Sequence, residues 1–316
     1  MGYYTIVSFC GGGIRGLMSA RILERLAKLR PSILTGTTLL AGTSTGSGIV
    51  SFLLANHSPD RICNYFLEQE RKFFANPKST SGKHPAYDVA EVAAGVFAVH
   101  GDKPLSKFDQ KVLFTAFFVG SEDVPWGPVL YNNLLNSENA DTSVVEAVTA
   151  SSAMPGMLGS WRRQVDGAFV NHDPTIAAIA VALANGAQFD DIAVINIGTG
   201  LMPDRIASDT ATWGAEQWQN GGPHHNRGNV TPPFLINGTV SPILDMALCG
   251  TSANLTPMLA GMMLGKRYVN INPRLDWYVP ENATSERDLT ELQVKAATAD
   301  LGAARSVLEA YWPPSS

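Results

Sequence analysis

Charged side chains are scarce in this sequence and make up 16% of its 316 residues, against roughly 25% in an average soluble domain. Hydrophobic residues make up 45%. An intrinsically disordered chain has the opposite balance, with high charge and few apolar residues, so that class is excluded. The net charge of -5 argues against a nucleic-acid partner, because nucleic-acid-binding proteins present a basic face. We expect a globular chain with a sizeable core.

Cysteine is also scarce. The three cysteines, Cys10, Cys63 and Cys249, form no close pair, so neither a disulfide framework nor a CxxC metal site can be read from them. No run reaches the roughly 18 apolar residues that a membrane span requires, and the first residues contain no cleavable signal pattern. We expect a reduced protein of the cytoplasm or of the membrane periphery. Export without a cleavable signal would leave the same sequence.

Strands and helices alternate at the start of the chain. Residues 4–9 are β-branched and aromatic and run into three glycines, and a helical pattern follows at 17–30. A second strand at 37–41 ends at a glycine, and a second helix is expected at 47–55. This β-turn-α order predicts a mostly parallel sheet with helices on its faces.

The middle of the chain, residues 60–160, shows a weaker pattern. We predict helices at 61–74 and 106–112, and strands at 114–119 and 128–132.

We see no linker long enough to separate two domains, so residues 1–316 are expected to form one domain. Residues 207–233 are rich in Gly, Pro, Asn and His and are predicted to form a loop or lid. Trp213 and Trp218 lie within that segment, where their rings could contact a lipid interface or a partner protein. A C-terminal helix is predicted at 285–312.

The pentapeptide Gly42-Thr43-Ser44-Thr45-Gly46 fits the G-x-S-x-G nucleophile elbow. The glycines are needed because the serine sits on a strained strand-to-helix turn, which a Cβ on either side would crowd. The sequence context agrees, with a predicted strand before the motif and a predicted helix after it. The alternative is a glycine turn in which the serine caps the helix.

A second glycine-rich segment, residues 11–16, reads Gly-Gly-Gly-Ile-Arg-Gly and fits G-x-G-x-x-G. A dinucleotide site would need an acidic residue near the end of the second strand. The predicted second strand, residues 37–41, has no acidic residue at its end. Successive backbone N–H groups of a glycine loop can instead bind an oxyanion. We favour that interpretation, with Arg15 adding positive charge or anchoring the loop.

The base that would activate the serine has two candidates. Asp166, in Asp166-Gly167-Ala168 at the end of a predicted strand, is the better one, since a carboxylate within hydrogen-bond reach of a hydroxyl can act as a general base. His224 and His225 in the predicted lid are the alternative. The alternative role of Asp166 is structural, as the first residue of a turn.

Together these segments resemble the patatin-like phospholipases, of the bacterial type. Residues 150–155 (Ala-Ser-Ser-Ala-Met-Pro) look like the family's segment before the Asp-Gly turn. Residues 195–200 look like its later strand, and 267–272 like its C-terminal strand. The ordered set runs from residue 8 to about 275, most of the chain. The resemblance implies an α/β fold of three layers, α/β/α, with a mostly parallel central sheet.

The resemblance also implies a set of site residues. It makes Ser44 the nucleophile and Asp166 the general base of a Ser–Asp dyad, with the oxyanion held by Gly11, Gly12 and Gly13. It further implies a supporting motif made of Arg15, Gly16, Gly42, Thr45, Gly46, Gly167 and Ala168. Because the base must be ionised, we expect a site that is not fully desolvated.

The implied activity is that of a lipid acyl hydrolase, of phospholipase A or lysophospholipase type, working through an acyl-enzyme without metal or cofactor. Its expected substrate is a lipid or phospholipid at a membrane interface. A neutral-lipid lipase or a thioesterase with the same dyad is one alternative, and a non-catalytic lipid-binding or regulatory protein is another. A nucleotide-binding oxidoreductase is the weakest. Apolar residues that could form an acyl groove, or only pack the core, are Phe52, Leu53, Leu54, Met154, Met157 and Leu158.

The chain departs from the family pattern at three places. Many members begin the glycine loop with Asp, where this chain has Cys10. Residues 169–174, after the dyad aspartate, are only loosely similar, and residues 207–233 match no family segment. We expect the first departure to affect the anchoring of the loop.

Overall fold

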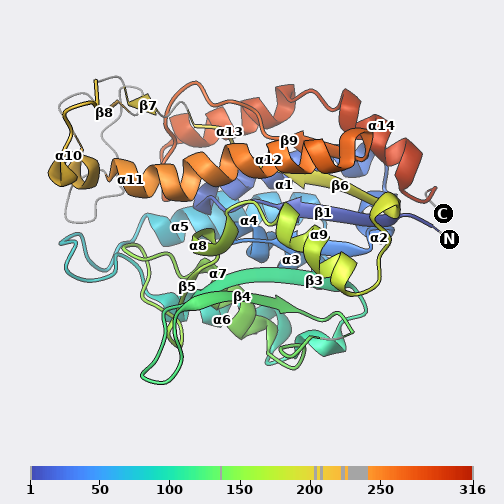
Figure 1. Ribbon diagram of the computed structural model, residues 1–316, viewed down its shortest axis with the longest axis horizontal. Coiled ribbons are helices and arrows are strands. Elements are labelled where there is room, and N and C mark those ends of the chain that lie inside the picture. Colours follow the sequence, from blue (N-terminus) through green and yellow to red (C-terminus); the bar gives the residue numbers. More distant parts are fainter. Residues whose placement is uncertain are drawn as a thin grey trace.

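A computed structural model describes residues 2–135, 137–202, 205–206, 209–221, 225–226 and 241–314. The described part of the chain forms three layers, with a central sheet between two layers of helices (Figure 1). The sheet has the order β4-β3-β2-β1-β6-β9, and a short further strand, β5, also pairs with β3. Its strands are β1 (Tyr4–Phe9), β2 (Leu39–Gly42), β3 (Lys111–Phe118), β4 (Gly127–Asn132), β5 (Gln164–Asp166), β6 (Ile192–Ile197) and β9 (Tyr268–Ile271).

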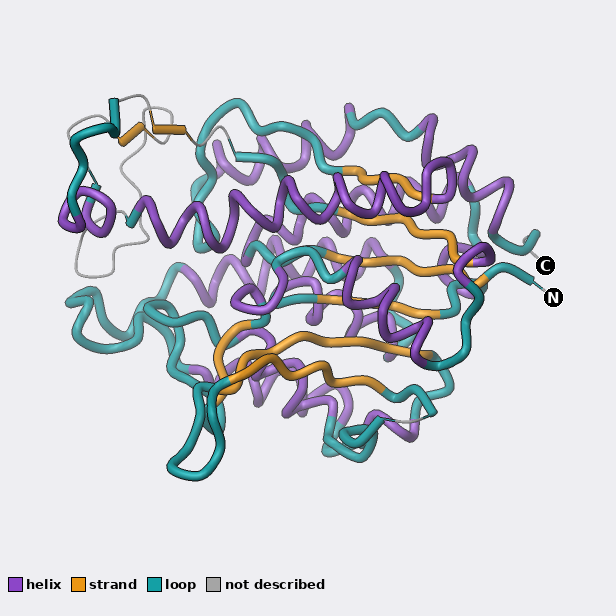
Figure 2. The backbone as a smooth tube through the Cα atoms, in the orientation of Figure 1, coloured by secondary structure: helices purple, strands orange, loops and turns teal. Residues whose placement is uncertain are grey.

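Most of this sheet is parallel, as predicted. The β2–β1, β1–β6, β6–β9 and β2–β3 pairs are parallel, and β4 and β5 run antiparallel to β3. Every residue of β6 is buried, which is typical of a parallel strand covered on both faces. The strands run side by side across the molecule (Figure 2), so the carboxyl ends of the parallel strands meet at one edge.

Residues alternate between the two faces of the sheet. Ile6 and Val194 pack into a small core beneath α9 and α12, whereas Val7 and Ile195 face the larger core. Helices α1, α3, α7, α13 and α14 contribute to that larger core. Their bounds are α1 (Gly16–Leu29), α3 (Thr45–Leu54), α7 (Val144–Ser152), α9 (Thr175–Ala184), α12 (Thr251–Leu264), α13 (Glu286–Thr298) and α14 (Gly302–Tyr311).

The other elements are short, except α6. They are α2 (Ser32–Thr35), α4 (Pro59–Tyr65), α5 (Arg71–Phe74), α6 (Val89–His100), α8 (Ala168–Asn171), α10 (Ala215–Asn220), α11 (Pro242–Asp245), β7 (Arg205–Ile206) and β8 (His225–Asn226). The chain between α4 and α5, Phe66–Glu70, is π-helical. Within the described residues, no helix is long and apolar enough to cross a membrane.

The predicted C-terminal helix at 285–312 is wrong as a single element, because α13 and α14 are separate. Ala299 adopts an extended conformation that ends α13, and Arg25 donates a hydrogen bond of 2.9 Å to its carbonyl. The Asp300 carboxylate then accepts a hydrogen bond of 2.8 Å from the N–H of Gly302, which favours a new helix start there.

The predicted lid at 207–233 lies largely outside the described residues. Of that segment, the structure describes 209–221 and 225–226. Trp213 and Trp218 meet edge to face there, with ring centroids 5.2 Å apart.

Candidate active site

Ser44 occupies the turn between β2 and α3, directly before the first residue of the helix. Its φ of 54° and ψ of -124° are strained for a residue with a side chain. The flanking glycines are required by space. A Cβ on Gly42 would lie 2.5 Å from the carbonyl carbon of Gly46, and a Cβ on Gly46 would overlap the carbonyl oxygen of Phe9. The geometry is that of a nucleophile elbow.

Asp166 is the last residue of β5, and its carboxylate meets the serine. The Ser44 hydroxyl donates a hydrogen bond of 2.7 Å to Oδ2 of Asp166, and the N–H of Ala168 donates one of 2.8 Å to Oδ1. Gly167 turns the chain against β3, where a Cβ would overlap the carbonyl oxygen of Thr115. One carboxylate oxygen is therefore oriented by the turn that the sequence singled out, and the other by Ser44.

Burial controls the protonation of Asp166, whose side chain is 1% exposed. Burial raises the pKa of Asp166 to about 7, against the opposing effect of hydrogen bonds from Ala168 and Ser44, and the charge of Glu281 raises it further. The Asp166 carboxyl is therefore more desolvated than the sequence led us to expect, whereas Ser44 beside it is partly exposed and lines a cavity. The carboxyl titrates near neutral pH because it has lost water and gained only two hydrogen bonds.

The glycine loop follows β1 and differs in one respect from the predicted arrangement. The N–H of Gly11 donates a hydrogen bond of 3.0 Å to the carbonyl of His172, so it is already engaged. Within the described part of the chain, the N–H groups of Gly12 and Gly13 have no acceptor. Both residues have positive φ, 151° and 55°. Of the three predicted oxyanion donors, Gly12 and Gly13 are free in this conformation and Gly11 is not.

Arg15 anchors the loop and is itself buried, at 4% exposed. Its guanidinium donates a hydrogen bond of 3.1 Å to the carbonyl of Val279 and forms an ion pair of 3.4 Å with Glu281. Gly16 lies close to the elbow, and a Cβ on it would lie 2.5 Å from Oγ1 of Thr45. The loop and the elbow are therefore packed directly against each other.

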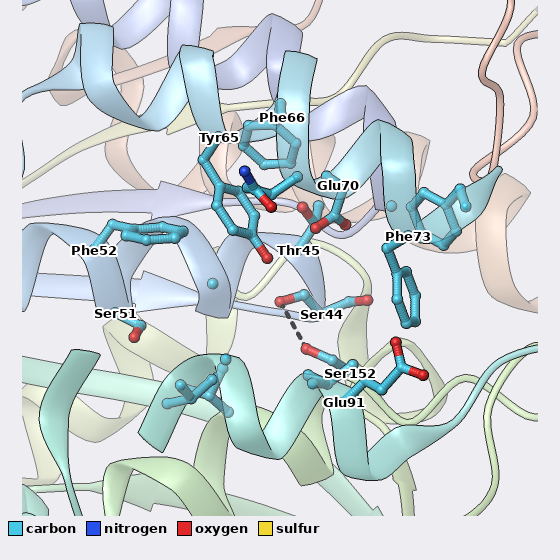
Figure 3. Close-up of a pocket in the computed structure, with 18 of the residues that line it drawn as sticks. Ser44, Thr45, Ser51, Phe52, Tyr65, Phe66, Glu70, Phe73, Glu91 and Ser152 are labelled. Atoms are coloured by element: carbon cyan, nitrogen blue, oxygen red, sulfur yellow. Dashed lines mark hydrogen bonds between the residues drawn. The ribbon is translucent and has the colours of Figure 1, made fainter. Parts of the chain in front are cut away.

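Two serines that received no role in the sequence analysis hold the backbone of the elbow. The N–H of Ser44 donates a hydrogen bond of 3.0 Å to Oγ of Ser151. The hydroxyl of Ser152 donates one of 3.4 Å to the Ser44 carbonyl (Figure 3). Residues 150–155 contain both, so the segment that carried part of the resemblance is the signal that could have found them.

No histidine that the structure describes takes part in the contact between Ser44 and Asp166. Among the described residues, the Ser44 hydroxyl hydrogen-bonds to Asp166 and to no histidine. His172 is the histidine at the glycine loop, and burial lowers its pKa to about 4, which keeps it neutral at physiological pH. His225 lies in β8, and His224 lies outside the described residues.

A cavity of about 780 Å³ opens beside Ser44. One wall comes from α4, the π-helical segment and α5, another from α6 and α7, and α3 lies between them (Figure 3). Of the predicted groove residues, those that line the cavity are Phe52, Met154, Met157 and Leu158. Leu53 and Leu54 pack against the core instead. In the part of the chain that the structure describes, no three His, Cys, Asp or Glu side chains are grouped to hold a metal ion.

A family model described as Patatin-like phospholipase matches residues 7–179. That span covers more than half of the chain and includes the elbow, Asp166 and the glycine loop. The chain belongs to the patatin-like phospholipase family. The α/β/α fold and the family predicted from the sequence are thereby confirmed, and the enzyme class that the family indicates is a lipid hydrolase.

Individual relatives are distant. The patatin-like chain is 28% identical over 288 residues to "Putative sporulation hydrolase CotR" of Bacillus subtilis, covering 87% of this chain and 88% of the relative. It is 27% identical over 285 residues to "Protein teg" of Priestia megaterium, covering 86% and 88%. It is 23% identical over 266 residues to "Patatin-08" of Solanum tuberosum, covering 68% of this chain and 66% of that protein.

Cys10 stands where many patatin-like phospholipases have an aspartate. Its surroundings suit a neutral side chain and not a charged one. Its thiol lies 3.6 Å from Oδ1 of Asn196, and Ser8 donates a hydrogen bond of 2.8 Å to the same oxygen. Burial, together with the charge of Asp173, raises the pKa of the Cys10 thiol. In this patatin-like chain the position holds a neutral, buried donor.

Proposed function

We propose that this patatin-like chain is a serine acyl hydrolase that cleaves fatty-acyl esters of lipids, of phospholipase A or lysophospholipase type. The observation that carries the proposal is the 2.7 Å hydrogen bond from the Ser44 hydroxyl to Asp166. A serine on an elbow, oriented by a base, is the arrangement that nucleophilic catalysis requires.

Acylation begins with proton transfer from Ser44 to Asp166. The serine oxygen attacks the carbonyl carbon of the ester, and the negative charge moves to the carbonyl oxygen. The N–H groups of Gly12 and Gly13 are the donors proposed to stabilise this oxyanion. The tetrahedral intermediate then breaks the bond to the leaving alcohol, which takes the proton from Asp166, and the fatty acyl group remains on Ser44.

Deacylation repeats these steps with water. The Asp166 carboxylate takes a proton from the water as it attacks the acyl-enzyme, and the proton is returned to Ser44 when the fatty acid leaves. A base with a pKa of about 7 suits both directions, because its two protonation states are both accessible near neutral pH.

The cavity supports an amphipathic substrate. Its α6 and α7 walls contribute Val92, Val96, Val99 and Val148, an apolar lining suited to an acyl chain. Its opposite wall contributes most of the polar and charged side chains. A lipid bound with its ester at Ser44 would meet both kinds of surface.

The test is release of fatty acid from mixed phospholipid vesicles by the wild-type protein, by Ser44→Ala and by Ser106→Ala. Loss of a catalytic serine costs about a million-fold in a comparable hydrolase, so release by Ser44→Ala should fall to background. Ser106 is exposed and bonds to Asp141, so its variant should match wild type. Retained activity in Ser44→Ala would contradict the proposal.

The same assay separates the alternatives. A preference for triacylglycerol would favour a neutral-lipid lipase, and a preference for acyl-coenzyme A would favour a thioesterase. A folded wild-type protein that hydrolyses none of these esters would favour the non-catalytic alternative.

A further inference from the structure

The polar wall of the cavity contains a π-helical turn, Phe66–Glu70. A π turn inserts an extra residue into a helix, and such turns are frequent at functional sites. Tyr65, directly before the turn, and Glu70, its last residue, both line the cavity that contains Ser44. The side chains of Tyr65, Glu70 and Phe73 are directed into the cavity from the same wall (Figure 3).

Glu70 differs from Glu91 and Glu281, two other carboxylates that line this space, and from Glu68, which lines it as well but is exposed to solvent. Glu91 forms an ion pair of 2.9 Å with Lys78, and Glu281 is paired with Arg15 at 3.4 Å. Among the described residues, no cationic side chain lies within ion-pair distance of Glu70.

The environment of Glu70 makes this lack of a cation costly. Burial raises the pKa of Glu70 to about 7, and hydrogen bonding from the Tyr65 hydroxyl opposes the rise. The Glu70 side chain is half-buried, and a desolvated carboxylate without a cation is unfavourable, so a ligand that supplies a positive charge would gain by binding there.

Aromatic side chains line the cavity on either side of Glu70 (Figure 3). Tyr65 packs against Phe52 with ring centroids 4.7 Å apart and against Phe66 at 6.0 Å. Phe73 lines the cavity on the other side of the turn. Aromatic faces attract organic cations, and quaternary ammonium groups are recognised in this way.

We propose that Glu70, with the rings of Tyr65 and Phe73, binds the ammonium group of a lipid headgroup. The preferred substrates are therefore zwitterionic phospholipids or lysophospholipids that carry choline or ethanolamine. This inference rests on the proposed acyl hydrolase activity and adds its headgroup class. Arg61 and Lys72 also line the cavity and provide positive charge for the phosphate of the same headgroup.

An anionic headgroup fits this site less well. Phosphatidylglycerol has the phosphate but carries no cation, so Glu70 would remain unpaired and would repel the ligand. The wild-type protein is expected to hydrolyse phosphatidylcholine faster than phosphatidylglycerol with the same acyl chains.

The experiment measures the ratio of these two rates in mixed micelles for wild type, Glu70→Gln and Glu91→Gln. Both variants replace a carboxyl group with a neutral amide, which controls for repulsion between the chain and an anionic surface. Loss of the carboxylate that pairs with the ammonium group should lower the ratio about ten-fold in Glu70→Gln. The ratio for Glu91→Gln should stay within about two-fold of wild type, because Glu91 is already paired with Lys78.

A soluble readout removes the lipid surface altogether. Glycerophosphocholine should inhibit hydrolysis of p-nitrophenyl butyrate by wild type more strongly than glycerophosphoglycerol does, and Glu70→Gln should lose the difference. Phe73→Leu, which keeps the carboxylate and removes a ring, should weaken inhibition by glycerophosphocholine as well. Because these are ratios and competition constants on active protein, a variant that folds less well still gives an answer.

Two results overturn the inference. The first is an unchanged headgroup ratio in Glu70→Gln, and the second is equal inhibition of wild type by the two glycerophosphodiesters. Either result leaves the proposed acyl hydrolase intact, provided that ester hydrolysis depends on Ser44. Hydrolysis that persists in Ser44→Ala would instead reject the proposed function.

Discussion

The hydroxyl of Ser44 and the carboxylate of Asp166 are 122 residues apart in sequence and joined by a hydrogen bond of 2.7 Å. Each side chain stands on a turn whose glycines are fixed by close packing. Gly46 lies against the backbone of Phe9, and Gly167 lies against the backbone of Thr115. The contact is therefore held by backbone packing at both ends, which favours a preorganised arrangement of the two side chains.

Asp166→Asn should remove activity and add stability. An amide cannot accept the serine proton, and loss of a comparable orienting carboxylate costs about 10,000-fold in rate. The buried carboxyl has a folded pKa of about 7 and an unfolded value near 3.9, so the folded state binds the proton more tightly. As the pH rises from about 4 to about 7, the wild-type protein therefore loses free energy of unfolding. Asp166→Asn does not share this loss.

The measurement is the urea midpoint of both proteins at pH 4, 6 and 8. The urea midpoint of Asp166→Asn should exceed that of wild type by the smallest margin at pH 4. The margin should grow towards pH 7 and stay level above it. An advantage that is independent of pH would show that the Asp166 carboxyl is not desolvated as the structure indicates.

The pH dependence of the reaction should report the same group. If ionised Asp166 is the base, kcat/KM for a soluble ester rises about ten-fold per pH unit below pH 7 and levels off above it. The profile from pH 5 to 9 with p-nitrophenyl butyrate is the measurement. If this rise, the acid limb of the profile, were centred near pH 4, the result would contradict a buried carboxyl as the base.

Glu281→Gln should move that limb to lower pH. The negative charge of Glu281 raises the pKa of Asp166, so removing the charge favours the ionised carboxylate. Glu286→Gln is the matched control, because Glu286 is exposed and pairs with Arg71. The prediction fails if the two variants shift the limb equally, or if Glu281→Gln shifts it upward.

The sequence was informative where function depends on local backbone geometry. Ser44 and Asp166 could be selected because their glycine neighbours form short motifs, and the packing distances explain why glycine is required at Gly42, Gly46 and Gly167. The mostly parallel sheet was predictable for a similar reason, since the early strands are short apolar runs that end in glycine turns.

Other features depended on contacts between distant segments. The N–H of Gly11 donates its hydrogen bond to the carbonyl of His172, which no pattern around the glycine loop reveals.

The predicted helix at 106–112 is wrong, because β3 begins at Lys111. Helix α6 was missed, since its valines resemble a strand and only Ala93 is fully buried.

A pair of glycine variants tests the packing of the elbow. Gly46 and Gly48 both lie in the first turns of α3, but a Cβ on Gly46 would overlap the carbonyl of Phe9, whereas a Cβ on Gly48 meets nothing within 4 Å. Gly46→Ala should lose about 3 kcal/mol of unfolding free energy. Gly48→Ala should be neutral or gain up to about 1 kcal/mol from helix propensity. Equal effects in urea denaturation would show that the close contact at Gly46 is not real.

The width of the proposed acyl groove can be tested at Gly95. This residue lines the cavity from α6, and a Cβ there would meet nothing within 4 Å. Gly95→Leu should therefore fold normally and place a branched side chain in the path of the acyl chain.

Activity of Gly95→Leu should fall about ten-fold more on p-nitrophenyl palmitate than on p-nitrophenyl butyrate, because displaced methylenes cost about 1 kcal/mol or more each in an apolar pocket. Ala94→Leu is the matched control, since Ala94 is the exposed neighbour on the same helix and does not line the cavity. A chain-length profile that is equal in the two variants would place the acyl chain elsewhere. A selective loss in Gly95→Leu would locate it between α3 and α6, with the leaving group on the side of Glu70.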